Sequence, residues 1–90
     1  MEFKRQQDGF YLENSEHGKY AEVTFSTAGD EVLVLDHTFV HEQYRGQHIG
    51  QNLIAEVVKM ARAENKKIIP LCPFSKAEFE RTPEYTDVKR

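Results

Sequence analysis

The chain has 90 residues, of which 39% are hydrophobic and 30% charged, and its formal net charge is −3. This length supports one modest hydrophobic core, so we expect a single domain over residues 1–90. The acidic balance excludes a general attraction to nucleic acid or anionic membranes. No apolar run approaches the ~18 residues that span a bilayer, and the start lacks the apolar centre of a secretory signal. Because a single cysteine excludes an internal disulfide, we expect a cytoplasmic protein.

The first half of the chain predicts a polar lead-in and three antiparallel strands. Residues 1–8 are polar apart from Phe3, which is a candidate anchor. Residues 10–13 read as a short strand, and residues 19–26 alternate apolar and polar side chains, as in a half-buried strand. Residues 31–40 contain an unbroken apolar run, which predicts a central strand covered on both faces. Turn-forming residues at 14–18 and 28–30 separate the three strands.

The second half predicts a helix, a strand and a second helix. Apolar residues recur with helical period from Ile49 to about Asn65, which we expect to act as the C-cap. Residues 67–71 are a short strand, one side of which should be an edge or a gap because Pro70 cannot donate a hydrogen bond. Residues 73–81 follow as a helix, and the tail 82–90 should pack through Tyr85 and Val88.

This order of elements, β-β-β-α-β-α, predicts an α+β fold. A three-stranded meander joined to one right-handed parallel crossover gives a mixed, mostly antiparallel, twisted sheet. Ligands of such sheets lie beyond the carboxyl ends of adjacent parallel strands. In this chain that position is the space between residues 38–40 and residues 71–72.

Residues 43–50 form a glycine-containing turn between the central strand and the long helix. A helix start presents unpaired N–H groups at the positive end of the helix dipole, which makes it an anion site. Gly46 permits positive φ or a close ligand, and Arg45 adds a cation that can form two parallel hydrogen bonds. We interpret the turn as a cradle for a diphosphate. The alternative is an ordinary turn with a solvated arginine, and the spacing excludes both a Rossmann fingerprint and a P-loop.

Two residues are candidates for chemistry beside this turn. Pro73 suits a first helical position, which places Cys72 at the N-cap, where the helix dipole lowers a thiol pKa. Cys72 could then act as a nucleophile or as an acid, and the alternative is a small buried thiol. His37 has the titration range of a general base, although a surface histidine is the alternative. Since successive strand residues face opposite sides, only one of Asp36 and His37 can face the site.

The four histidines do not predict a metal site, because no Cys/His spacing matches zinc binding. We therefore expect no metal ion in the site.

The residues Arg45-Gly46, Ile49-Gly50 and Leu53 resemble motif A of the GNAT acetyltransferases, which binds the diphosphate of acetyl-CoA. The sequences Ile-Pro-Leu-Cys-Pro-Phe at residues 69–74 and Pro-Glu-Tyr at residues 83–85 are similar to the compact single-domain group of that superfamily. The resemblance covers residues 10–85 and implies the minimal acyl-CoA N-acyltransferase fold. One departure is His48, which stands where the motif usually has its second glycine.

This resemblance implies an enzyme that uses acetyl-CoA or coenzyme A and transfers an acetyl group to an amine, with Cys72 and His37 as candidate catalytic residues. It also implies that backbone groups of the splayed strand bind pantetheine and polarise the thioester carbonyl. Larger members use a carboxyl-terminal tyrosine as acid, for which Tyr85 is the only counterpart in that region. The implied cofactor-binding residues are Thr38, Phe39, Val40, Arg45, Gly46, Gln47, His48, Ile49, Gly50 and Phe74.

The expected partners are therefore acetyl-CoA and an unidentified amine, in a monomer or weak homodimer, without nucleic acid or membrane. The sequence leaves two alternatives open: a non-catalytic sensor or regulatory module that binds coenzyme A or acyl-CoA, and a protein-interaction domain that has lost cofactor binding.

Overall fold

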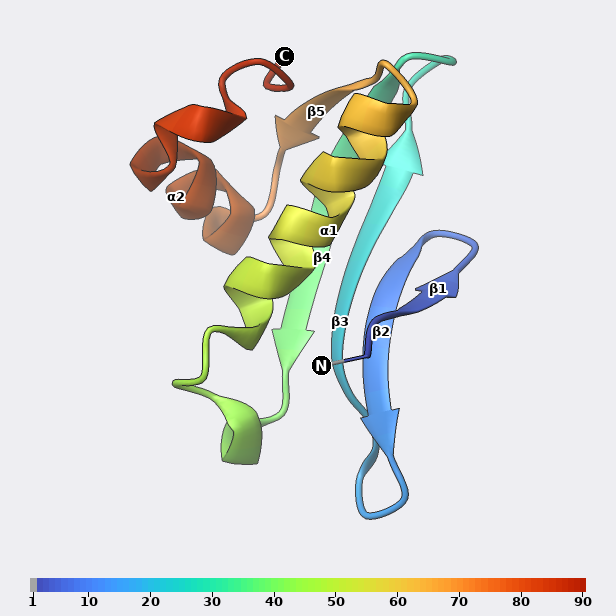
Figure 1. Cartoon of the computed structure of the whole chain (residues 1–90), viewed down its shortest axis with the longest axis vertical. Helices are drawn as coiled ribbons and strands as arrows, with labels where there is room; N and C mark the ends of the chain where they lie inside the picture. The colour runs from blue at the N-terminus through green and yellow to red at the C-terminus, as the bar shows by residue number, and fades with distance from the viewer. Residues whose placement is uncertain (1) are drawn as a thin grey trace.

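The computed structural model describes residues 2–90 and contains one five-stranded sheet with helices packed against it (Figure 1). Its strands lie side by side in chain order, and they are β1 Lys4–Gln6, β2 Gly9–Asn14, β3 Gly18–Thr27, β4 Val32–Val40 and β5 Lys67–Pro70. Strands β1 to β4 pair antiparallel, whereas β4 and β5 pair parallel. The helices are α1 Ile49–Ala63 and α2 Pro73–Arg81, with short 3-10 helices η1 Glu42–Tyr44 and η2 Pro83–Tyr85.

The predicted α+β fold with one parallel crossover is confirmed, with one strand added at its amino end. The prediction of a lead-in without structure is wrong for Lys4–Gln6, which pair with Gly9–Tyr11 of β2 as an edge strand. A three-residue polar strand is too short to show a period in sequence, because its stability comes from the neighbouring strand. Phe3 packs against the core as expected, while Met1 lies outside the described residues.

The hydrophobic core lies between the sheet and α1. The alternation predicted for β3 is confirmed, since Ala21, Val23 and Phe25 are buried and Glu22 and Thr24 are not. Burial of one helical stripe against a sheet face supplies most of the stability of such a helix. In α1 the buried stripe consists of Ile49, Gly50, Leu53, Ile54, Val57, Val58 and Ala61.

Strand β4 is covered on both faces only in part. Val32, Leu33 and Leu35 are buried, whereas Val34 is half-buried on the face turned away from α1. None of the helices within residues 2–90 is long and apolar enough to cross a membrane.

The ends of the two helices are fixed by backbone hydrogen bonds. Helix α1 ends one residue earlier than predicted, with Glu64 as the C-cap and Asn65 following it at a φ of 56°. The amides of Lys66 and Asn65 donate to the carbonyls of Ala61 and Arg62 at 2.8 and 3.4 Å, which is the Schellman arrangement. Helix α2 begins as predicted, with Cys72 at the N-cap and a proline after it.

Strand β5 lies at one edge of the sheet, in agreement with the prediction that Pro70 requires an edge or a gap on one side. Its pairing with β4 ends at Leu35 and Pro70, after which the amides of Leu71 and Cys72 both donate to the Leu35 carbonyl. On its outer side the tail forms a bridge, in which the Ile68 amide donates to Val88 at 2.6 Å. The predicted packing of Val88 is therefore confirmed.

Strands β4 and β5 separate beyond Leu35. Strand β4 continues to Val40 with β3 as its neighbour, while the chain after β5 turns into α2. A bulge in the β3–β4 ladder pairs Thr24 with His37 and Phe25 with Leu35, which leaves Asp36 as the extra residue. The second half of β4 thus borders an opening whose far sides are the starts of α1 and α2.

Candidate active site

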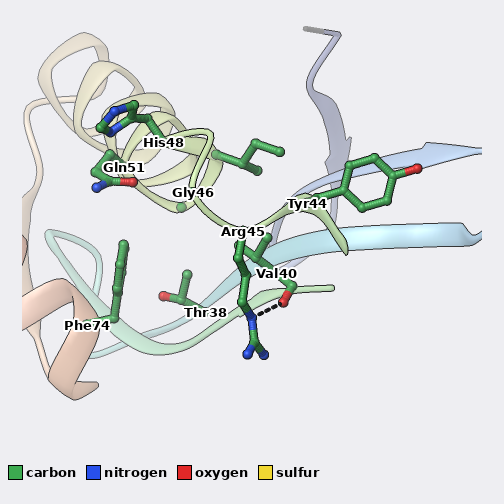
Figure 2. A pocket seen from close by; sticks show the side chains of 10 residues that line it. Thr38, Val40, Tyr44, Arg45, Gly46, His48, Gln51 and Phe74 are labelled. Atoms are coloured by element: carbon green, nitrogen blue, oxygen red, sulfur yellow. Dashed lines mark hydrogen bonds between the residues drawn. The ribbon is translucent and has the colours of Figure 1, made fainter. Parts of the chain in front are cut away.

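A pocket of about 390 Å³ fills this opening (Figure 2). Its walls come from the end of β4, the glycine turn and the first turns of both helices, so the edge and the turn that the sequence singled out are one site. The lining residues are Thr38, Val40, Tyr44, Arg45, Gly46, His48, Ile49, Gly50, Gln51 and Phe74.

The start of α1 supplies hydrogen-bond donors to the pocket. The first helical bond runs from the Asn52 amide to the His48 carbonyl at 3.0 Å. The amides of Ile49, Gly50 and Gln51 precede that bond, so they point out of the helix end toward the pocket. The His48 side chain makes no capping hydrogen bond. These donors and the positive end of the helix dipole suit an anion.

The turn before α1 uses two residues in the left-handed region. Gly46 has a φ of 86°, which a glycine adopts without strain. His48 has a φ of 61°, which is strained for a residue with a Cβ atom. The turn thus keeps a glycine-like backbone at the position where the motif usually has glycine. The His48 ring is exposed and points away from Thr38 and Arg45 (Figure 2).

Arg45 joins the turn to the end of β4. Its Nε donates to the Val40 carbonyl at 3.0 Å, and the remainder of the guanidinium extends past that carbonyl (Figure 2). This bond uses one edge of the side chain and leaves Nη1 and Nη2 at the rim of the pocket. Arg45 is exposed, so solvent screens its charge.

Tyr44 and Gln51 line the pocket but were not predicted. The Tyr44 ring stacks on Tyr20 at 4.2 Å, and its hydroxyl accepts a hydrogen bond from Asn14 Nδ2 at 2.6 Å. Tyr44 therefore attaches the turn to the β2–β3 hairpin. Because these contacts join segments distant in sequence, no local pattern reports them.

Two histidines also meet beside Tyr44. The rings of His17 and His41 lie 4.6 Å apart, and His41 Nδ1 accepts a hydrogen bond from the Gln43 amide at 3.1 Å. Within residues 2–90 no group of three or more His, Cys, Asp or Glu side chains is arranged to hold a metal ion. The hydrogen bond from the Gln43 amide to His41 helps to shape the turn.

The backbone of β4 presents alternate residues to the opening. The His41 amide donates to Tyr20 at 2.7 Å, and Phe39 is paired with Glu22 of β3. Residues two apart in an antiparallel ladder bond to the same neighbour, so the backbone groups of Thr38 and Val40 face the opening instead.

Four predicted site residues are not part of the pocket lining: Phe39, His37, Gln47 and Cys72. Phe39 directs its backbone to β3, and its side chain is 38% exposed on the sheet face opposite Thr38. His37 is exposed and next to Thr38 in the strand, so its ring also faces away from Thr38 and Cys72. Gln47 is exposed in the turn. The other predicted cofactor-binding residues all line the pocket.

Cys72 lies on the same side of the sheet as the turn. Its Sγ is 3.4 Å from the Thr38 hydroxyl, which lines the pocket. The sulfur also accepts a hydrogen bond from the Ser75 amide at 3.4 Å and contacts Ser75 Oγ at 3.1 Å. Thr38 therefore connects the pocket with the thiol.

The surroundings of Cys72 lower the pKa of its thiol. Partial burial is the largest single influence and acts to raise that pKa, because it disfavours the charged form. Hydrogen bonds from Ser75 and Thr38, with the amides at the start of α2, together outweigh it and stabilise the thiolate. The thiolate is the reactive form of cysteine.

Comparisons with known proteins give one family. A model of the GCN5-related N-acetyl-transferase family matches residues 9–88. The solution structure of a GCN5-like protein from Staphylococcus aureus superposes with a TM-score of 0.84 and 35% identity, over 99% of this chain and 87% of that chain. No curated protein matches the chain.

Larger structures share the fold over part of their length. A ribosomal-protein-alanine N-acetyltransferase from Brucella melitensis superposes with a TM-score of 0.61 and 18% identity, over 81% of this chain and 59% of its own. A GNAT-family acetyltransferase from Staphylococcus aureus superposes with a TM-score of 0.60 and 17% identity, over 83% of this chain and 49% of its own. At these identities the likeness is one of fold, and this chain spans about half of their length.

Proposed function

Because the chain belongs to the GCN5-related N-acetyltransferase family and is an acyltransferase enzyme, we propose that it transfers an acetyl group from acetyl-CoA to an amine through Cys72. The observation that carries this proposal is the contact of 3.4 Å between Cys72 Sγ and Thr38 Oγ1. Thr38 lines the pocket that begins at the amides of α1, so the hydroxyl in contact with the sulfur shares one cavity with the anion donors. A free thiol suits a reducing compartment, and we place the enzyme in the cytoplasm.

The pocket offers groups that suit both the diphosphate and the pantetheine arm of the cofactor. The amides of Gly50 and Gln51 would hold the diphosphate, and Arg45 would add charge at the rim. The outward backbone groups of Thr38 and Val40 would pair with the amides of the pantetheine arm. Phe74 forms the apolar wall beside this arm.

Cys72 would act as the nucleophile. Its thiolate attacks the thioester carbonyl, forming a bond from Sγ to the acetyl carbon while the bond to the coenzyme A sulfur breaks. That sulfur leaves as a thiolate and takes a proton from solvent. The acceptor amine then attacks the acetyl carbon, loses a proton and releases Cys72. The Thr38 amide, which points into the opening, would stabilise the oxyanion formed in each step.

The lowered pKa of Cys72 favours this role over that of an acid. An acid must keep its proton until the coenzyme A sulfur departs, and the hydrogen bonds at Cys72 stabilise the deprotonated form instead. His37 takes no part in the proposed steps because its ring faces away from Cys72.

Intact-mass measurement after incubation with acetyl-CoA tests the proposal. The native chain should gain one acetyl group, and addition of a panel of amines should discharge it onto the acceptor. Cys72→Ser is the matched control, because serine is a preferred N-cap residue and keeps the start of α2. Wild-type transfer by this variant would refute a role for Cys72. Cofactor binding with neither a labelled protein nor an acetylated amine would instead support a non-catalytic module.

A further inference from the structure

Ser75 is a fully buried polar residue in the first turn of α2. Its hydroxyl donates to the Cys72 carbonyl at 3.0 Å and lies 3.1 Å from Cys72 Sγ. The same carbonyl also accepts the helical hydrogen bond from the Lys76 amide at 2.9 Å. Because the Lys76 amide already donates a hydrogen bond to that carbonyl, the Ser75 hydroxyl can donate to the sulfur without leaving the carbonyl unpaired.

We propose that Ser75 is a positioning residue for Cys72, and that its hydroxyl turns from the Cys72 carbonyl to Sγ when the thiol loses its proton. The inference rests on the proposed function, in which Cys72 is the reacting group. In the protonated state the thiol donates to Ser75 Oγ and the Ser75 hydroxyl donates to the carbonyl. After the proton leaves for solvent, the hydroxyl donates to the thiolate and Lys76 keeps the carbonyl. No bond between heavy atoms changes.

The two hydroxyls beside the sulfur differ in their surroundings. Thr38 lines the pocket, so a ligand in the pocket competes for its hydroxyl. Ser75 is 0% exposed, and neither ligand nor water reaches it. A hydrogen bond to an ionised group is stronger than one between neutral groups, and exclusion of water preserves that strength. Ser75 therefore provides the constant contact that holds Sγ toward Thr38.

The pH dependence of alkylation of Cys72 by iodoacetamide tests this role. In Ser75→Ala the profile should move to higher pH, with the rate near neutrality lower by about tenfold and the high-pH plateau unchanged. The variant keeps the Ser75 position helical, because alanine is the best helix former and the Lys76 bond remains. Ser26→Ala, at an exposed serine of β3, is the matched control and should keep the native profile.

Two outcomes would overturn the inference. One is a Ser75→Ala profile that superposes on the native one. The other is a rate that falls by the same factor at every pH, because that result reports access to the sulfur and not its ionisation. In the native chain, the Ser75 and Cys72 Cβ resonances should titrate with one midpoint, and a Ser75 signal that stays constant through the Cys72 titration would also contradict it.

This experiment needs no cofactor, so it separates the inference from the proposed function. A shifted Ser75→Ala profile in a protein that never acquires an acetyl group would refute acetyl transfer through Cys72 and support the positioning role of Ser75. An acetylated Cys72 with an unshifted Ser75→Ala profile would refute the positioning role of Ser75 and support acetyl transfer through Cys72.

Discussion

At the scale of single residues, His48 is where the sequence and the backbone disagree. Motif A usually has glycine at this position, and the backbone adopts the conformation that glycine would take without strain, with a φ of 61°. The turn is held by its neighbours, because Arg45 bonds to Val40 and Tyr44 stacks on Tyr20. The geometry of the amide cradle is therefore maintained at a cost in conformational energy.

His48→Gly should raise the free energy of unfolding by about 1 kcal/mol, because it removes the strain of a left-handed residue with a Cβ atom. Urea unfolding measures this change. Asn65→Gly is a matched control, since Asn65 has a φ of 56° but asparagine tolerates this region, and its gain should be smaller. Calorimetry should also show tighter coenzyme A binding by His48→Gly. A weaker complex would mean that the imidazole contacts phosphate.

Cys72 makes stability depend on pH. Because the pKa of its thiol is lower in the folded chain than the ordinary 9.0, folding favours the thiolate. The resulting stabilisation is complete above the pKa of the unfolded thiol and is lost as the pH falls through the folded pKa. The difference in unfolding free energy between the native chain and Cys72→Ser should therefore grow as the pH rises toward 9.0. A difference that shrinks over this range would mean that the folded thiol is not stabilised as a thiolate.

At the scale of elements, the starts of α1 and α2 approach each other where Gly50 faces Phe74. A Cβ atom added at Gly50 would lie 2.7 Å from Cζ of Phe74, so the missing side chain leaves room for that ring. The Phe74 ring in turn forms a wall of the pocket (Figure 2). Gly50 thus sets how closely the apolar wall approaches the amide donors.

Gly50→Ala should weaken coenzyme A binding while stability changes by no more than about 1 kcal/mol. Alanine favours the helix by about 1 kcal/mol, which offsets the movement of a half-buried ring. Calorimetry and urea unfolding measure the two effects separately. Gly50→Ala combined with Phe74→Leu should regain part of the affinity, because the smaller side chain clears the added methyl group. Unchanged affinity in the single variant would show that the ring can leave the pocket wall freely.

The elements that the sequence predicted are those with a repeating apolar pattern. The alternation in β3 and the helical stripe of α1 need only one buried face, so their periods predict them directly. Strand β1 depends on pairing with β2, and the bulge at Asp36 depends on register with β3. Neither leaves a local signal. For this reason the alternation of residues in β4 could not predict which face of the sheet carries the His37 side chain.

At the scale of the whole molecule, the net charge of −3 opposes an anionic ligand. Binding must then depend on local donors, of which Arg45 is the charged one at the pocket rim. The site could be located from sequence because two arguments, the turn and the strand ends, point to one edge of the sheet. The roles of Tyr44 and Ser75 could not be predicted, because they depend on contacts with Tyr20, Asn14 and Cys72 that only the folded chain shows.

Arg45→Ala should weaken coenzyme A binding by about three- to tenfold at low salt and by less at high salt, because counterions screen an exposed charge. Calorimetry at two ionic strengths measures both values. Lys59→Ala removes an exposed cation from α1 outside the pocket lining and should have little effect at either. An equal loss for Arg45→Ala at both ionic strengths would indicate that its bond to Val40 shapes the turn.

The most direct test is an amide chemical-shift titration of the labelled native chain with acetyl-CoA. Peptide amides at the start of α1 are predicted to hold the diphosphate and so to bring the thioester to the sulfur. The largest shifts should then fall on Gly46, Gly50 and Gln51, with Cys72 and Ser75 responding at the same ligand concentrations. Shifts confined to the opposite face of the sheet, around His37 and Phe39, would contradict the account.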